Sequence, residues 1–209
     1  MNKKKILKAL GLVACAILLV VGSIAGTMAF MTDSKTVTNT FTVGKVAITM
    51  DEAKVDQYGV KDGDSRVTTG NTYKLIPNHT YVKDPTIHVA GGSERCYLFV
   101  KVVNGIKDIE ADTNNIAAQL AANKWVALEG VENMYYYDEV VDARETASTE
   151  FKNVPVFAEF TVDSSVENDD LTAYDAATLV VTAYAIQADG FDTAAAAWTA
   201  ASGAFTPAP

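Results

Sequence analysis

The side chains best suited to bind a metal ion are the chain's two histidines, His79 and His88. Asp84 lies between them, so two imidazoles and a carboxylate could supply three ligands to zinc. Their spacing matches no local zinc motif, and "TIHV" places His88 on the strand face opposite Ile87 and Val89. We therefore expect one strand histidine and one turn histidine, and we predict no metal site and no cofactor.

The other side chains that could bind a metal ion or act in catalysis also match no known type of metal or catalytic site. In "KDIEADTNN", Asp108, Glu110 and Asp112 alternate, but the stretch lacks the glycine and the final acidic residue of an EF-hand calcium loop. A solvated acidic loop is the preferred interpretation. Cys96 begins an apolar strand, which indicates a core residue rather than a nucleophile. Motifs of serine hydrolases, P-loop proteins, dinucleotide-binding proteins and zinc peptidases are absent, so we predict no catalytic residue.

Three adjacent tyrosines in "MYYYDE" could form a platform for a sugar or a peptide. On a strand, Tyr135 and Tyr137 would share one face and Tyr136 the other, and one of these faces is expected to be core. The cluster is therefore weak evidence for binding.

Segments typical of strands dominate the chain after residue 40. They are alternating or densely apolar, and clusters of Gly, Pro, Asn and Asp separate them. A polar stretch at 56–71 is expected to be a loop or an exposed hairpin. The pattern predicts a mainly β, antiparallel sandwich or barrel in a single domain over 30–209. The expected strands are "TFTVGKVAITM" (40–50), "YKLIPNHTYVKDPTIHVAGG" (73–92), "CYLFVKVVNG" (96–105), "MYYYDEVV" (134–141), "VFAEFTVD" (156–163) and "TLVVTAYAIQA" (178–188).

Three shorter segments favour small helices at the periphery of this sandwich. In "NNIAAQLAANKW", Ile116, Leu120 and Trp125 recur at roughly helical spacing. Two further helices are expected within 169–177 and 191–203, each preceded by polar residues suited to cap it. The expected caps are Asp169 or Asp170, and Asp192 or Thr193.

The first 29 residues have the pattern of a secretory signal peptide. A run of lysines precedes an uncharged stretch at 9–29, which closes on the small residues of Thr27-Met28-Ala29. We predict cleavage between Ala29 and Phe30. If left uncut, the apolar run is long enough to anchor the chain in a membrane, and this is the only membrane contact we expect. "LVAC" at 12–15 resembles a lipoprotein cleavage box, but the apolar stretch before Cys15 is short for one.

The charge and the cysteine content of the mature chain limit its possible partners and its possible disulfide bonds. Removing residues 1–29 removes four lysines and no acid, which changes the formal net charge from −9 to −13. Such an acidic surface argues against nucleic acid as a partner, because the negatively charged phosphates of nucleic acids bind Lys and Arg side chains. Cys96 is the one cysteine that remains, so no disulfide can form within the mature chain.

The junction "GTMAFMTDSKTVTNTFTVGKVAIT" resembles that of the TasA and camelysin family of exported proteins of Gram-positive bacteria. A second block, "KLIPNHTYVKDPTIHV", is similar to the family's turn "L-x-P-G-x-x-x-x-K-D", with Asn78 where Gly is usual. A third, "TLVVTAYAIQADGF", resembles the family's late core strand. These matches cover the first and last thirds of the mature chain, and residues 105–155 have no counterpart among them.

The resemblance implies a jelly-roll β-sandwich, cleavage by a SipW-type signal peptidase, and export to the cell surface or matrix. In some family members the freed N-terminal segment of one subunit completes the sheet of the next, which forms biofilm fibres. An unpaired terminal strand beside an open sheet edge supports the same idea on physical grounds. The residues expected to form this assembly segment, at about 30–43, are Phe30, Met31, Thr32, Asp33, Phe41 and Val43.

The sequence thus predicts a secreted structural protein that associates with itself through its mature N-terminus. A monomeric surface-binding or adhesion module is the alternative. The camelysin name also implies a metal-dependent endopeptidase, which would require His79, His88 and an acid to converge. No residue here matches a zinc-peptidase motif, so that activity has no support by position.

Overall fold

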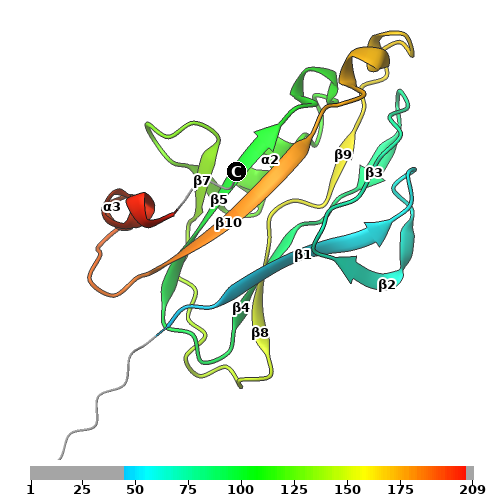
Figure 1. Ribbon diagram of the computed structural model, residues 1–209. Helices are drawn as coiled ribbons and strands as arrows, with labels where there is room; N and C mark the ends of the chain where they lie inside the picture. The colour runs from blue at the N-terminus through cyan, green and yellow to red at the C-terminus, as the bar shows by residue number, and fades with distance from the viewer. Residues whose placement is uncertain (1–44, 206–209) are drawn as a thin grey trace, which may run out of the picture. The chain divides into compact units, whose positions relative to one another are not determined.

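The computed structural model describes residues 45–205 of the chain, which belong to one compact unit (Figure 1). The predicted signal peptide 1–29, its cleavage site at Ala29 and Phe30, and the predicted assembly segment at 30–43 lie outside the described residues. Within 45–205 every strand pairing is antiparallel, and two four-stranded sheets enclose a shared apolar core. The mainly β sandwich predicted from the sequence is confirmed, while the jelly-roll connection stays a prediction.

The first sheet has the strand order β2-β1-β4-β8. The polar stretch after β1 forms the exposed hairpin strand β2, as the sequence predicts. Its strands are β1 (Ile48–Val55), β2 (Lys61–Val67), β4 (Thr86–Ala90) and β8 (Phe151–Pro155).

The second sheet has the order β10-β5-β7-β6, and β3 and β9 form a separate two-stranded ribbon. Figure 1 shows β10 lying along β5 for the full length of both strands. The strands are β3 (Thr80–Val82), β5 (Cys96–Asn104), β6 (Trp125–Ala127), β7 (Met134–Tyr137), β9 (Glu159–Thr161) and β10 (Leu179–Gln187).

Period-two alternation explains which strand faces form the core. In β4, Ile87 and Val89 are fully buried, while His88 between them lies on the outer face. In β5, Leu98 and Val100 are fully buried against them. From β10, Leu179, Val181, Ala183 and Ala185 pack on the same core. The two sheets therefore bury facing apolar surfaces, which is the main source of stability for a fold without a disulfide.

Helices lie at the periphery, and one predicted boundary is wrong. The helix α2 (Ile116–Ala122) is capped by Asn115, whose side chain accepts a hydrogen bond from the Ala118 N–H at 2.8 Å. Trp125 does not belong to it but begins β6, because Lys124 adopts a left-handed backbone with φ of 64° that ends the helix. Apolar spacing alone cannot reveal such a break.

The other two helical segments also differ in detail from the prediction. Asp170–Tyr174 forms a 3-10 helix, η2, with no capping bond from the Asp169 side chain, so the predicted cap there is wrong. The helix α3 (Ala194–Ala201) does begin as predicted, since Thr193 Oγ1 accepts from the Ala196 N–H at 3.1 Å. Short 3-10 turns, η1 (Lys107–Ile109) and η3 (Ser202–Ala204), complete the described elements.

Three asparagines hold backbone conformations that usually require glycine. Asn78, Asn114 and Asn133 have φ angles of 55°, 57° and 58°. Asn tolerates the left-handed region better than most residues do, because its short polar side chain bonds locally. The asparagine at position 78 therefore suits the turn before β3 as glycine would.

Candidate functional site

Strand β10 has an open edge. It is hydrogen-bonded to β5 on one side, and no other strand among residues 45–205 pairs with its second side. Its nine residues, LVVTAYAIQ, include no charge and no proline. A strand with one unpaired edge presents a row of backbone N–H and C=O groups, and another strand can bond to this row when no charge opposes it.

The three other outer strands of the sheets are protected in ways that β10 is not. Four of the seven residues of β2 are charged, which opposes pairing with a further strand. Strand β8 contains a lysine and ends at Pro155, and β6 is three residues long. Among the described strands, β10 is thus the edge best suited to accept a partner.

A groove runs beside the N-terminal half of this open edge. Its larger part has a volume of about 700 Å³ and its smaller part about 250 Å³. Thr69, Gly70, Lys83, Leu179 and Val180 line both parts, so the two are continuous. This feature is bounded by residues 50–52 of β1, 67–75, Lys83, η2 and 178–181, and we call it the β10 groove.

The β10 groove offers both apolar surface and backbone to an extended chain. Its lining includes Tyr73, Leu75 and Leu179, which pack on the core from the groove side. Val180, at the open edge, is 46% exposed. A strand laid here would gain main-chain bonds from β10 and cover apolar side chains at alternate positions, the two elements of strand-addition binding.

The structure places the two histidines at different sites. His79 bonds through Nε2 to the Tyr58 carbonyl at 2.8 Å and packs edge-on against Tyr81. His88 bonds through Nε2 to Asp51 Oδ1 at 2.9 Å and through Nδ1 to Asn153 at 2.7 Å. Within residues 45–205 no group of three or more His, Cys, Asp and Glu side chains could hold a metal ion.

His88 belongs to a charged network on the outer face of the first sheet. Asp51 also accepts from Arg66 of β2, and Arg66 contacts Asp84 at 3.3 Å. Burial acts to raise the pKa of Asp51, but the bonds from His88 and Arg66 outweigh it and hold that pKa below its usual value. Salt bridges at this exposure typically contribute up to about 1 kcal/mol each, so the network orients β1, β2 and β4 more than it stabilises them.

The acidic stretch at 108–112 has a structural role at one position. Glu110 accepts from the Ile116 N–H at 2.6 Å, at the start of α2, and from Asn104 Nδ2 at 3.0 Å. Burial raises the pKa of the Glu110 carboxyl, and these two bonds partly oppose the shift. Asp108 and Asp112 are both exposed, and the Asp112 backbone carbonyl accepts from Asn115 Nδ2 at 3.2 Å.

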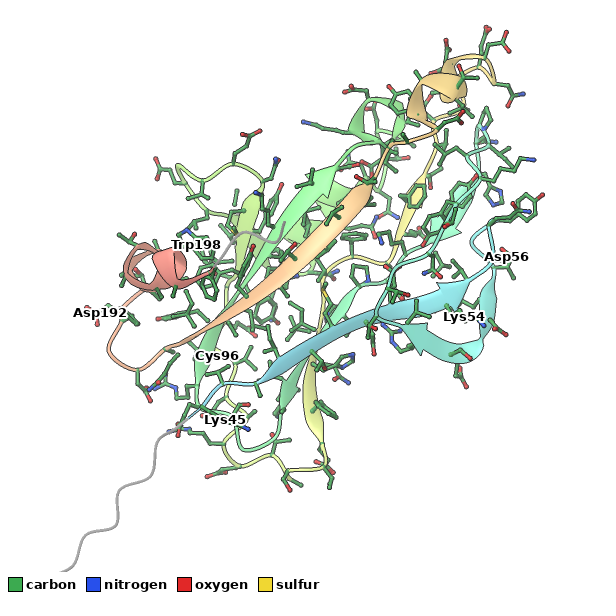
Figure 2. All side chains as sticks on the ribbon, viewed as in Figure 1. Lys45, Lys54, Asp56, Cys96, Asp192 and Trp198 are labelled. Carbon is green, nitrogen blue, oxygen red and sulfur yellow. The ribbon has the colours of Figure 1, made fainter. Side chains whose placement is uncertain are left out.

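The tyrosine cluster alternates as predicted, and it is covered on both faces. Tyr135 and Tyr137 pack on the core between the sheets, while Tyr136 packs on a second cluster formed with α3. Trp198 of α3, labelled in Figure 2, belongs to that second cluster, and its ring centroid lies 5.0 Å from that of Phe99. All three tyrosines are half-buried, which leaves little of the exposed aromatic platform that the sequence suggested.

Cys96 is a fully buried core residue, as predicted. Burial, with a smaller contribution from nearby Asp142, raises the pKa of its thiol to about 11. At pH 8 roughly one molecule in a thousand would carry the reactive thiolate.

We therefore expect native protein that begins at Phe30 to give no colour reaction with a chromogenic disulfide reagent for thiols. The same protein, once denatured, should titrate one thiol. A Val103→Cys variant, with a thiol at a position that is 41% exposed, should react once while native; rapid reaction of Cys96 itself would contradict the burial.

Comparisons with known proteins do not assign the chain to a family. No protein-family model matches it, and searches of curated proteins and of solved structures give no significant match. Among residues 45–205, no helix is long and apolar enough to span a bilayer. The resemblance to the TasA and camelysin family accordingly stays a prediction from the sequence, and the open edge of β10 with its groove is the feature on which a function can be argued.

Proposed function

We propose that the chain is a secreted structural protein of the cell surface or matrix that assembles by strand addition. In this proposal, segment 30–43 of one copy pairs with the open edge of β10 in another copy. The observation that carries the proposal is the nine-residue, uncharged edge of β10 beside an apolar groove.

The chemistry of the segment fits the chemistry of the groove. After Lys35 the segment reads "TVTNTFTV", which has no charge and places Phe41 and Val43 on one face of a strand. Residues 30–43 are more than enough to span the nine residues of β10. The uncharged, alternating part of the donor, residues 36–43, thus meets an uncharged edge and a lining with apolar side chains.

The direction of the chain favours pairing between copies. Lys45 lies at the end of the sandwich that holds Cys96 (Figure 2), where its carbonyl accepts from the Glu94 N–H at 3.1 Å. Cys96 pairs with Gln187, the last residue of β10, whereas the groove lies beside Leu179, the first. A segment from a second copy can enter at the groove end, while a segment of the same copy would first have to reverse direction next to Lys45.

Such pairing is head-to-tail and does not close on itself, so it produces filaments. The predicted signal peptide would control the process, because a segment still joined to a membrane-inserted helix cannot insert into a neighbour. A SipW-type signal peptidase would release it by cutting between Ala29 and Phe30. Its partners are then this peptidase and other copies of the chain.

The first test images protein that begins at Phe30, at high concentration, by negative-stain electron microscopy. Filaments are expected, and a matched protein that also lacks residues 30–43 should give none. If both proteins stay monomeric by size-exclusion chromatography, the assembly proposal fails and the monomeric adhesion module becomes the better reading.

A pair of valine variants tests whether β10 is the acceptor. Val180→Lys places a charge on the open edge, and we expect it to abolish filaments or shorten them at least tenfold. Val103→Lys is the matched control, because Val103 lies opposite Val180 on the inner strand β5 and is similarly exposed, at 41% against 46%. Equal loss of filaments in both variants would place the contact on the sheet face rather than at the edge.

A further inference from the structure

Three polar side chains from separate parts of the chain meet beneath the β10 groove. Glu52 comes from β1, Asn71 from the connection after β2, and Lys83 from the residue after β3. Glu52 and Lys83 are only 6% and 8% exposed. We call these residues the Glu52 triad.

One carboxylate holds the other two members of the triad. Lys83 Nζ donates to Glu52 Oε2 at 2.6 Å, and Asn71 Nδ2 donates to Glu52 Oε1 at 2.8 Å. An amine and a carboxamide are thus neighbours on the two oxygens of a single buried acid. Burying an ion pair usually costs more than an apolar replacement of the same volume, so stability alone does not explain this arrangement.

The Asn71 carboxamide is also held by the backbone of β1. Its Oδ1 accepts from the Val55 N–H at 3.0 Å, and its Nδ2 donates to the Ala53 carbonyl at 2.9 Å. Hydrogen bonds to an amide lie near its plane, so these contacts fix the orientation of the group without occupying its faces, from which an amine would attack. The Val55 N–H is placed to stabilise negative charge if the carbonyl oxygen becomes an oxyanion.

We propose that Lys83 and Asn71 join in an intramolecular isopeptide bond, with Glu52 as the catalytic residue that moves the protons. Glu52 takes a proton from the Lys83 ammonium, and the freed amine attacks Cγ of Asn71. The new Nζ–Cγ bond forms, and the attacking nitrogen then gives up a second proton. The Cγ–Nδ2 bond breaks, and Glu52 relays both protons in turn to the departing nitrogen. The products are a secondary amide and ammonium, and nothing is oxidised or reduced.

The fold supplies the conditions that this reaction needs. An amine held next to an amide reacts within one molecule, which replaces a slow encounter in solution by a fixed geometry. Glu52 and Lys83 line the smaller part of the β10 groove, and Asn71 and Lys83 line the larger part, so ammonia has an exit.

The bond would tie the connection after β2 to the strand junction before β4. This tie borders the β10 groove, because residues 69–75 form one of its walls. The reaction itself involves a single copy and does not depend on whether copies assemble.

Intact-mass spectrometry of the folded protein that begins at Phe30 tests the proposal. We expect a mass lower than that of the sequence by one molecule of ammonia. Trypsin should then yield a branched peptide in which Val67–Lys74 is joined to Leu75–Arg95, with the chain uncut at Lys83. Recovery of the full mass, with Val67–Lys74 and Leu75–Lys83 as separate peptides, would overturn the proposal.

Two variants separate chemistry from packing. Lys83→Arg keeps the ion pair but cannot attack the amide, and Glu52→Gln keeps the shape but cannot carry the proton. Both should show the full mass, with circular dichroism like that of the parent protein. If Glu52→Gln still loses ammonia between the same two peptides, Glu52 is not the catalytic group. Protein lacking residues 30–43 should form the bond as well, so failure of assembly and failure of this proposal are distinguishable.

Discussion

Gly91→Ala is expected to prevent the domain from folding. A Cβ at this position would lie 1.9 Å from the Ala147 carbonyl oxygen and 2.9 Å from that of Thr146. Both obstacles are backbone atoms of the segment before β8, which is itself fixed because the Gly91 N–H donates to the Glu150 carbonyl at 2.9 Å. No side-chain rotation can relieve the clash, so the cost should exceed the roughly 1–3 kcal/mol of ordinary overpacking.

Urea unfolding of the protein that begins at Phe30 measures this effect. Gly203→Ala is the matched control, because its Cβ would meet no atom within 4 Å. We expect the control to unfold at the parent's urea midpoint or slightly above it, and Gly91→Ala to be insoluble or largely unfolded without urea. A cooperative transition at the parent's midpoint for Gly91→Ala would mean that the segment 146–150 does not pack on this turn.

Tyr81→Ala is expected to destabilise the fold by about 3–5 kcal/mol, the usual cost of truncating a buried aromatic residue. Tyr81 is fully buried and stacks on Phe160 with ring centroids 4.8 Å apart. Tyr73 meets the edge of the same ring pair at 5.7 Å from Tyr81. The three rings join the β3–β9 ribbon to the core, so the cavity left by alanine cannot easily collapse.

Tyr81→Phe isolates the hydroxyl from the ring. It keeps the stacking but removes the bond from the Tyr81 hydroxyl to the Lys74 carbonyl, which measures 2.6 Å. An unsatisfied part-buried carbonyl costs about 1–3 kcal/mol, so this variant should fall between the parent and Tyr81→Ala in its free energy of unfolding. Equal losses in the two variants would assign the effect to the hydrogen bond and not to ring packing.

Much of the fold could be predicted because its strands carry local signals. Strand β5 and strand β10 are dense apolar runs, and the period of two in "TIHV" correctly separated His88 from Ile87 and Val89. Strand β8 was missed, because only Val154 of its five residues is buried and Phe151 is 51% exposed. The strand forms because it pairs with β4, and its own sequence has no alternating apolar pattern from which a strand could be predicted.

The candidate site could be predicted only in part. The sequence predicts a donor segment, since an alternating stretch follows the predicted cleavage site directly, and this segment stays a prediction. The sequence does not indicate the proposed acceptor, because the groove gathers residues as distant in sequence as Gly70, Phe160 and Leu179. The Glu52 triad was missed for the same reason. Its members have no common spacing, and only the folded path of the chain from β1 to the end of β3 brings Asn71 and Lys83 to the Glu52 carboxylate.

Strand β10 is the last strand among residues 45–205, yet its partner β5 lies near the middle of the chain. During synthesis β5 is therefore complete long before the strand that must pair with it exists. Contacts between such distant parts of a chain form slowly, on a scale of about milliseconds to seconds in all-β domains. The second sheet is thus expected to close only after nearly the whole polypeptide has been made.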